Sequence, residues 1–302
     1  MAIMAEQILN GINYGLLLFL IAAGLSLVFG VMHLINLAHG SLFMVGAFAT
    51  AALFQVTGSF VLSAICATLL AAGTGYVLER TIIRELYARN HLDQVLATFG
   101  LILFANELLR WLSGGVPQFV PAPELFSGTV MLPGNIEYPA YRLMVTAIAA
   151  ITALGMWVII AKTRVGMLVR ASASNPAMVR RIGFDVGLIS TLVFAAGAGL
   201  AGLAGVLTGP LVSIEVGMGE QVLILSFVIV VIGGLGSIRG TFLSAMLVGL
   251  VDTLGRALMP LALNGVISAR TASSLAPALS ATLVYLLMAV VLIVRPQGLF
   301  AR

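Results

Sequence analysis

The feature that most constrains this fold is a long stretch without any formally charged side chain. Residues 7–78 contain no Asp, Glu, Lys or Arg. Because one transmembrane helix needs about 20 apolar residues, this stretch alone is long enough to cross a bilayer about three times. Of the 302 residues, 61% are hydrophobic and only 9% are charged, whereas soluble domains carry about 25% charged residues. The composition predicts a polytopic α-helical protein in a lipid bilayer rather than a barrel, whose strands would alternate apolar and polar residues over about 10 positions.

Charges, prolines and glycine clusters divide the chain into nine apolar segments. They are residues 9–34, 41–56, 59–78, 94–113, 143–161, 187–210, 221–237, 241–262 and 275–294. The first two segments are so close that they form either a hairpin or one crossing followed by a re-entrant piece. The expected fold class is therefore all-α: one transmembrane helical bundle over residues 1–302, with about eight or nine membrane segments.

The loops between these segments differ in charge, which predicts their orientation. Short loops rich in Lys and Arg face the cytoplasm, so loop 79–93, with three arginines, and loop 162–185, with five Lys and Arg residues, are expected there. Loop 114–141 has five prolines, two glutamates and no Lys or Arg, and the acidic link 211–220 has no basic residue. Both are expected outside. The tail 295–302 holds two arginines and is expected inside, so nine crossings would place the N-terminus outside.

A group of polar residues interrupts the apolar run VMHLINLAHGSLFMVGAF at residues 31–48. The group comprises Asn36, His39, Gly40 and Ser41. Asn36 or Ser41 can cap a helix start, and Gly40 permits an unusual backbone angle. Inside a bilayer such a break is tolerated only where protein or a wet cavity surrounds it, and broken helices mark translocation sites in many transporters. A short cytoplasmic turn with His39 at the interface explains the pattern equally well.

Ionisable and metal-ligating residues are few within the apolar segments. His33 and His39 are six positions apart, off the i, i+4 spacing of two ligands on one helix face, and no carboxylate or thiolate is nearby in the sequence, so no metal site is expected. Asp252 and Arg256 are four positions apart and can pair on one helix face. Such groups face the bundle interior or a wet cavity. A structural ion pair and a pathway-lining pair both remain open.

Loop 162–185, KTRVGMLVRASASNPAMVRRIGFD, is too polar to cross the membrane and too patterned to be a flexible linker. Asn175 is a good N-cap, and Pro176 suits the first helical position. Gly183 is placed to end the helix. We therefore predict a short cytoplasmic helix over residues 176–182.

The side chains of this short helix allow two interpretations. Met178 and Ile182 fall on one side of it. Arg180 and Arg181 could hold the helix against the membrane surface. Alternatively, Met178 and Ile182 could insert into a groove of a cytoplasmic partner.

Four phrases of the chain resemble, in the same order, those of the LivH-like permeases, the membrane subunits of Liv-type branched-chain amino-acid ABC importers. The phrases are GLSLVFGVMHLINLAHGSLFMVGAF (24–48), RASASNPAMVRRIG (170–183), VIGGLGSIRGTFLSAMLVGLVD (231–252) and RPQGLF (295–300). The resemblance covers nearly the whole chain, and loop 114–141 matches no phrase of the family. It implies that residues 170–183 contain the helix that couples to the ATPase. The coupling-helix candidates are Asn175, Pro176, Ala177, Met178, Arg181, Ile182 and Gly183.

The resemblance also implies a set of partners and a location. The chain would be one of two permease subunits in a bacterial inner membrane, beside a second Liv-type permease. Two cytoplasmic ATPase subunits would dock on the coupling helices, and a periplasmic binding protein would deliver the substrate. The sequence contains no G-x-x-x-x-G-K-[ST] phosphate loop, so ATP and Mg²⁺ are expected on the partner chains, with no cofactor and no enzymatic activity in this one. The net charge is +4, but the basic residues are scattered, which does not indicate nucleic-acid binding.

The substrate and the energy source are less constrained. Members of the resembled family carry leucine, isoleucine and valine, and relatives are linked to urea, short amides and aromatic or alicyclic acids. An ion-coupled secondary transporter is the alternative class. Such a transporter would need membrane-embedded ionisable residues, and His33, His39, Asp252 and Arg256 are all that this chain offers.

Overall fold

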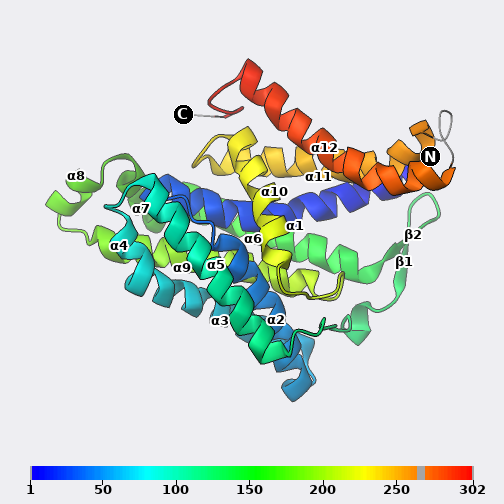
Figure 1. Ribbon diagram of the computed structural model, residues 1–302, viewed down its shortest axis with the longest axis horizontal. Coiled ribbons are helices and arrows are strands. Elements are labelled where there is room, and N and C mark those ends of the chain that lie inside the picture. Colours follow the sequence, from blue (N-terminus) through cyan, green and yellow to red (C-terminus); the bar gives the residue numbers. More distant parts are fainter. Residues whose placement is uncertain (1, 264–268, 301–302) are drawn as a thin grey trace.

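The structure, a computed structural model, describes residues 2–263 and 269–300 and consists almost entirely of helices (Figure 1). The long helices are α1 (Ala2–Met32), α2 (His39–Thr57), α3 (Phe60–Leu78), α5 (His91–Ser113), α6 (Ala140–Lys162), α9 (Val186–Thr208), α10 (Met218–Gly233), α11 (Ile238–Leu263) and α12 (Ala269–Val294). The short elements are η1 (Glu79–Ile83), α4 (Arg84–Leu86), η2 (Glu124–Phe126), β1 (Thr129–Leu132), β2 (Ile136–Pro139), α7 (Arg164–Ser174) and α8 (Pro176–Arg181). Within the described ranges, eight helices are long and apolar enough to cross a membrane, and α10 is a shorter apolar helix. The predicted all-α transmembrane class is confirmed.

The chain runs back and forth between two ends of the bundle (Figure 1). One end holds α4, α7 and α8 and is called the basic end here; the other holds the N-terminus, β1 and β2 and is called the hairpin end. At the hairpin end, Gln118 and Ile214 exchange backbone hydrogen bonds and so join two loops that the charge pattern places on one side. At the basic end, Leu299 N donates to Ile232 O and holds the described part of the tail. Arg302 lies outside the described residues.

Helix α1 is the centre of the bundle. Its residues 16–28 are buried, and α9, α10 and α11 pack around it. A Cβ added to Gly249 of α11 would lie only 2.5 Å from Gly15 Cα of α1. Helix association in lipid depends on such close backbone packing, so glycine is required where α1 crosses α11.

The chain between α1 and α2 turns back into the bundle. After Met32, His33 adopts a φ of 52°, an uncommon left-handed angle for a residue with a Cβ, and residues 33–38 are not helical. Helix α2 then starts beside Ile21 of α1. At 1.5 Å per residue, Ile21 lies about 16 Å before the end of α1, so α2 starts well inside the bundle.

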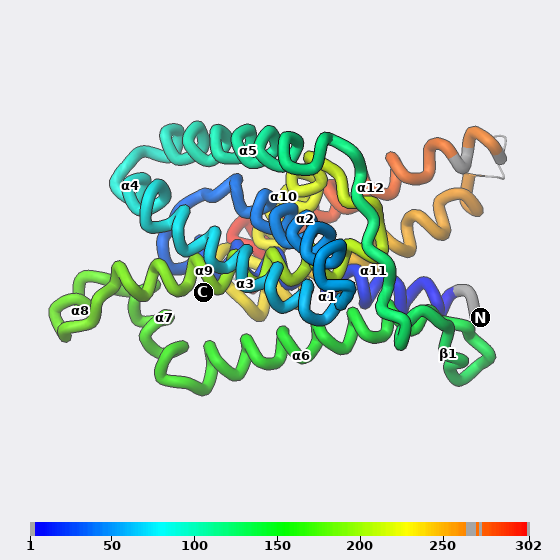
Figure 2. The backbone as a smooth tube through the Cα atoms, turned by 90° about the horizontal axis from the view of Figure 1, so that it is seen from below, coloured from blue at the N-terminus to red at the C-terminus, as the bar shows by residue number. Residues whose placement is uncertain are grey.

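Helix α10 also begins inside the bundle. Residues 209–217 return from the hairpin end before α10 starts at Met218. Figure 2 shows α2 and α10 next to each other at the centre of the molecule. A Cβ added to Gly40 of α2 would overlap the carbonyl oxygen of Gly219 of α10. The first turns of two helices therefore meet deep in the bundle.

The hairpin-end loop contains structure that the sequence did not predict. Strands β1 and β2 pair antiparallel, with Leu132 opposite Ile136. Gly134 and Asn135 at the tip have φ angles of 93° and 56°. Glycine and asparagine tolerate this left-handed region best, which explains the hairpin at this point.

Candidate functional site

A cavity of about 550 Å³ lies on the hairpin side of the bundle, among α1, α6, α9 and α11. Its polar lining consists of Gln7, Asn10, Asn13, Tyr14, Arg142, Thr208, Asp252, Thr253 and Arg256. Towards the middle of the bundle its lining becomes apolar, with Ile21, Phe43 and Val222. We call this space the hairpin-side cavity.

Asp252 and Arg256 line this cavity as an ion pair. Arg256 Nε donates to Asp252 Oδ2 at 2.9 Å, and Nη2 donates to Oδ1 at 3.1 Å. Two parallel bonds of this kind fix the orientation of both groups. The Asp252 side chain is 6% exposed and that of Arg256 is 53% exposed. The predicted i, i+4 pair is therefore present, and its arginine is accessible from the cavity.

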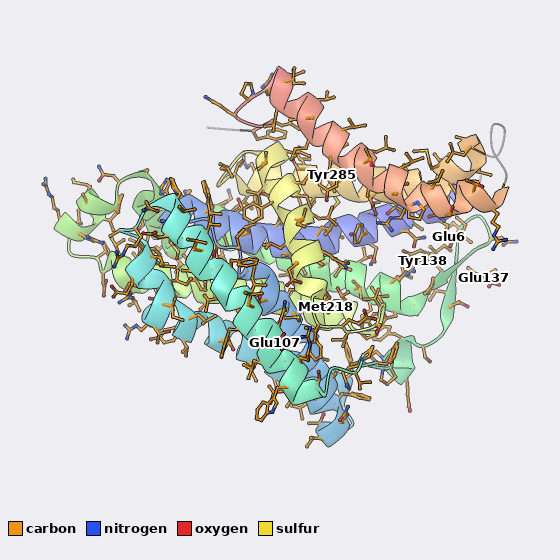
Figure 3. All side chains as sticks on the ribbon, in the orientation of Figure 1. Glu6, Glu107, Glu137, Tyr138, Met218 and Tyr285 are labelled. Carbon is orange, nitrogen blue, oxygen red and sulfur yellow. The ribbon has the colours of Figure 1, made fainter. Side chains whose placement is uncertain are left out.

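A second polar cluster in this cavity was missed by the sequence analysis. Asn10 Oδ1 accepts hydrogen bonds from Tyr138 Oη at 3.0 Å and from Arg142 Nη1 at 2.5 Å. Asn13 Nδ2 donates to Arg142 O and Thr146 Oγ1, both at 2.9 Å. Figure 3 places Tyr138 beside the N-terminal part of α1. Across residues 2–263 and 269–300, no three His, Cys, Asp or Glu side chains gather as a possible metal site.

The predicted break residues Asn36 and His39 are fully buried. Asn36 Oδ1 accepts from Ala38 N at 3.0 Å, and His39 Nε2 lies 3.2 Å from Ile21 O. In the tautomer with the proton on Nε2, the imidazole donates to this carbonyl of α1. Among the described atoms, Asn36 Nδ2 and His39 Nδ1 have no hydrogen-bond partner. A surface turn with His39 at the membrane interface is therefore wrong.

Gly40 and Ser41 have other roles than the predicted ones. Both lie in the first turn of α2, which starts at His39. The left-handed residue is His33, and Gly40 is needed because the backbone of α10 passes close to it. Ala38 occupies the N-cap position, and no side chain caps this helix. Capping by Asn36 or Ser41 was therefore a wrong prediction, because the buried start of α2 is stabilised by packing instead.

A second cavity, of about 810 Å³, lies at the basic end. We call it the basic-side cavity. Its lining includes Ser26, Gly30, His33, Trp157, Arg170, Ser237 and Arg239. It is bounded by the last turns of α1, by α7 and by the connection between α10 and α11.

A short wall of packed residues separates the two cavities along α1. Ile21 lines the hairpin-side cavity and Ser26 lines the basic-side cavity, and residues 22–25 between them are buried. A Cβ on Gly24 would lie 2.6 Å from Gly197 O and 2.9 Å from His39 Nε2. His39 therefore packs against the wall.

The predicted site residues do not share one cavity. Asp252 and Arg256 line the hairpin-side cavity. His39 packs against the wall, and none of the predicted residues Asn36, His39, Gly40 and Ser41 lines either cavity, although His33 lines the basic-side cavity.

The predicted short helix at the basic end is confirmed as α8. Asn175 Oδ1 accepts from Met178 N at 3.0 Å, Pro176 is the first helical residue, and Gly183 follows the helix with a φ of 96°. Met178 is 52% exposed and Ile182 is 63% exposed. The helix ends at Arg181, one residue earlier than predicted, and two large apolar side chains, Met178 within it and Ile182 at its C-cap, are exposed.

The other side chains of α8 differ in exposure, and a second helix precedes it. Ala177 and Arg181 are exposed, whereas Val179 is buried towards the bundle. Helix α7 precedes α8 and was not predicted; Thr163 caps it by accepting from Gly166 N at 3.2 Å. The basic loop is therefore an ordered pair of helices.

Two relatives match most of this chain. The "High-affinity branched-chain amino acid transport system permease protein BraD" of Pseudomonas aeruginosa is 29% identical over 83% of this chain and 85% of the relative. The "High-affinity branched-chain amino acid transport system permease protein LivH" of Escherichia coli K12 is 26% identical over 98% of this chain and 95% of the relative. No solved structure gives a significant match.

The family profile gives the broadest match. Residues 7–294 match the family described as "Branched-chain amino acid transport system / permease component". This range includes the hairpin-side cavity, most of the basic-side cavity, the wall around His39 and α8. The chain is therefore a multi-pass membrane protein that belongs to the family of branched-chain amino acid transport system permease components.

Proposed function

We propose that this chain is the permease subunit of an ATP-driven ABC importer in a bacterial inner membrane, and that it moves branched-chain or other hydrophobic amino acids inward. The family match and the names of the two relatives support this proposal. In this proposal the basic end faces the cytoplasm, in agreement with the charge of its loops. ATP and Mg²⁺ are bound by the partner chains.

The two cavities are proposed to be the outer and inner parts of the translocation pathway. The wall beside His39 closes the connection between them. His39 packs against this wall. We propose that Asn36, Gly40 and Ser41 keep the start of α2 in place, so that a shift of α2 relative to α1 and α10 would open the wall. Switching between two packed arrangements is a common way to couple distant events.

Asp252 and Arg256 are proposed to line the outer part of the pathway. Their charges, together with Arg142, suit a small solute that carries both a carboxylate and an ammonium group. Urea, short amides and aromatic or alicyclic carboxylates are the alternative substrates. Transport assays with each class, using the cognate binding protein, decide among them.

Helix α8 is the observation that carries the proposal of ATP coupling. A short, capped helix with two exposed apolar side chains fits a groove on a partner protein. We assign this groove to a cytoplasmic ATPase subunit. The complete importer would then contain a second Liv-type permease, two ATPase subunits and a periplasmic binding protein.

Co-purification tests this assignment. We expect ATPase subunits that are co-expressed with this chain to co-purify with it, and the double variant Met178→Glu, Ile182→Glu to abolish this association. Leu125→Glu is the matched control, since Leu125 is also an exposed apolar residue but lies at the hairpin end. The control is expected to keep the ATPase bound. Substrate movement by the reconstituted chain alone, driven by an ion gradient, would overturn the proposal in favour of a secondary transporter.

A further inference from the structure

A buried carboxylate lies at the basic end, outside both cavities. Glu79 follows α3 as the first residue of η1, and its side chain is fully buried although Arg80 and Thr81 beside it are exposed. The turn η1 is π-helical, a geometry that is rare and frequent at functional sites. Burying a carboxylate is strongly unfavourable unless it is paired and hydrogen-bonded. The residues that pair with Glu79 therefore explain how its carboxylate can be buried.

Three side chains satisfy this carboxylate. Tyr87 Oη donates to Glu79 Oε1 at 2.8 Å, and Thr191 Oγ1 donates to Oε2 at 2.7 Å. The Arg84 guanidinium lies 3.5 Å from Oε2. Burial and the hydrogen bond to Glu79 raise the pKa of the Tyr87 phenol far above its ordinary value, so this hydroxyl stays a donor at any physiological pH. We call these residues, Glu79, Arg84, Tyr87 and Thr191, the Glu79 cluster.

The Glu79 cluster joins parts of the chain that are distant in sequence. Glu79 and Arg84 belong to the connection after α3, whereas Thr191 lies in α9. Tyr87 Oη also lies 3.3 Å from the sulfur of Met32, the last residue of α1. One carboxylate thus ties the basic ends of α3 and α9 together, and the Tyr87 hydroxyl that bonds to it also contacts the last residue of α1.

One of these helices, α9, is the next helix after α8 in the chain. Helix α8 ends at Arg181 and α9 begins at Val186, where Asp185 caps it by accepting from Leu188 N at 3.2 Å. Arg84 Nη2 donates to Thr191 Oγ1 at 2.8 Å and to Gly187 O at 3.4 Å. The cluster therefore holds the first two turns of α9, the helix that follows α8 in the chain.

The middle of the same helix reaches the wall between the cavities. Gly197 of α9 packs against Gly24 in the wall, and a Cβ on Gly46 of α2 would overlap the carbonyl oxygen of Gly202. Met32, which the cluster also contacts, directly precedes the irregular residues 33–38. Helices α1 and α9 thus both run from the Glu79 cluster to the wall.

We infer that Glu79 is a positioning residue for energy coupling: its buried carboxylate, with the Tyr87 hydroxyl, holds the basic ends of α1, α3 and α9 together, so that they move as one body when α8 is displaced. The inference rests on the proposed function, in which an ATPase subunit moves α8. Without the carboxylate, α9 could shift against α1 and α3 at the basic end. ATP hydrolysis would then continue while the wall beside His39 opens less often.

The number of substrate molecules imported per ATP hydrolysed tests this inference. The assay uses the complete importer in proteoliposomes, with the binding protein and its substrate. Glu79→Gln keeps the size of the side chain and removes its charge, and Glu85→Gln is the matched control because Glu85 is an exposed carboxylate of the same connection. We expect Glu79→Gln to lower this ratio about tenfold, with ATPase co-purification and ATP hydrolysis retained, and Glu85→Gln to leave the ratio unchanged.

A double-mutant cycle supplies the second readout. Thr191→Val removes the hydroxyl that bonds to Glu79, so its effect on the ratio should not add to that of Glu79→Gln. A ratio equal to that of the wild type, or a loss of transport and ATP hydrolysis in equal proportion, would overturn the inference. Should Glu79→Gln fail to assemble, Tyr87→Phe removes a single donor and is judged by the same ratio. A wild-type complex that transports without ATP would instead contradict the proposed function.

Discussion

Two interruptions of the helical bundle, residues 33–38 and α8, have opposite surroundings. At the first, the polar side chain of Asn36 is fully buried, as is that of His39, which directly follows the interruption as the first residue of α2. At the second, the apolar side chains of Met178 and Ile182 are more than half exposed at the basic end. Each arrangement is the reverse of what stability alone favours, since polar groups prefer water and large apolar groups avoid it.

The difference between the two interruptions indicates different roles. The break at residues 33–38 is held by close backbone packing between α2 and its neighbours α9 and α10, so its role depends on the internal arrangement of this chain. Helix α8 lies at the outer edge of the basic end (Figure 1) and presents its apolar side chains outward, so its role depends on a partner. Substitutions at the break should therefore change folding and transport, and substitutions on α8 should change association.

Gly40→Ala should have the largest effect. The added methyl group would overlap the carbonyl oxygen of Gly219, so the backbone of α2 or α10 would have to shift. Overpacking of this kind costs about 1–3 kcal/mol, and we expect a loss of thermal stability together with nearly all transport. The measurements are the melting temperature of the purified protein and substrate uptake.

Gly73→Ala is the matched control for Gly40→Ala. It adds the same methyl group within α3, where nothing lies within 4 Å of the new Cβ. This variant should keep wild-type stability. Equal melting temperatures for the two variants would show that α2 and α10 do not pack tightly at the break.

His39→Ala should have an intermediate effect, on transport and not on association with the ATPase. It removes the imidazole that contacts Ile21 O and packs beside Gly24 in the wall. We expect uptake to fall about tenfold, equivalent to about 1.4 kcal/mol on the limiting barrier, while the ATPase subunits still co-purify. Loss of co-purification would mean that the break supports assembly and not the pathway.

Asn175→Ala should have the smallest effect. It removes the side chain that caps α8 through Met178 N. Loss of an N-cap costs about 1 kcal/mol of helix stability, and if α8 must be helical to dock, ATPase binding weakens about fivefold. A binding titration with the isolated ATPase measures this change. Unaltered affinity would indicate that α8 docks without its cap.

The sequence predicted the elements that depend on local patterns. The apolar segments and α8 with Asn175, Pro176 and Gly183 were found because hydropathy, caps and helix stops are local signals. The break was predicted a few residues too late, at 36–41 instead of 33–38. Its left-handed residue is His33, which carries no such signal, and Gly40 serves close packing that a sequence pattern does not distinguish from backbone freedom.

What the sequence did not predict depends on contacts between distant residues. In the sequence, Glu79 is only a charged residue at the end of an apolar segment. Its hydrogen-bond partner Thr191 lies 112 positions away. Asn10 and Arg142 are joined across 132 positions in the same way. Which polar groups meet in these cases is decided by the packing of the helices, and the position of each cavity follows from that packing.

A packed wall beside His39 separates two cavities that open at opposite ends of the bundle. The accessibility of introduced cysteines tests this separation. The single cysteine of the sequence, Cys66, is exposed and would first be changed to serine. Thr253→Cys then places a thiol in the hairpin-side cavity, and Ser237→Cys places one in the basic-side cavity.

A membrane-impermeant thiol reagent, added to vesicles of either orientation without ATP, reports which face reaches each introduced thiol. We expect the Thr253→Cys variant to react only from the face with the hairpin end, and the Ser237→Cys variant only from the face with the basic end. Reaction of both variants from the same face would contradict the separation of the two cavities.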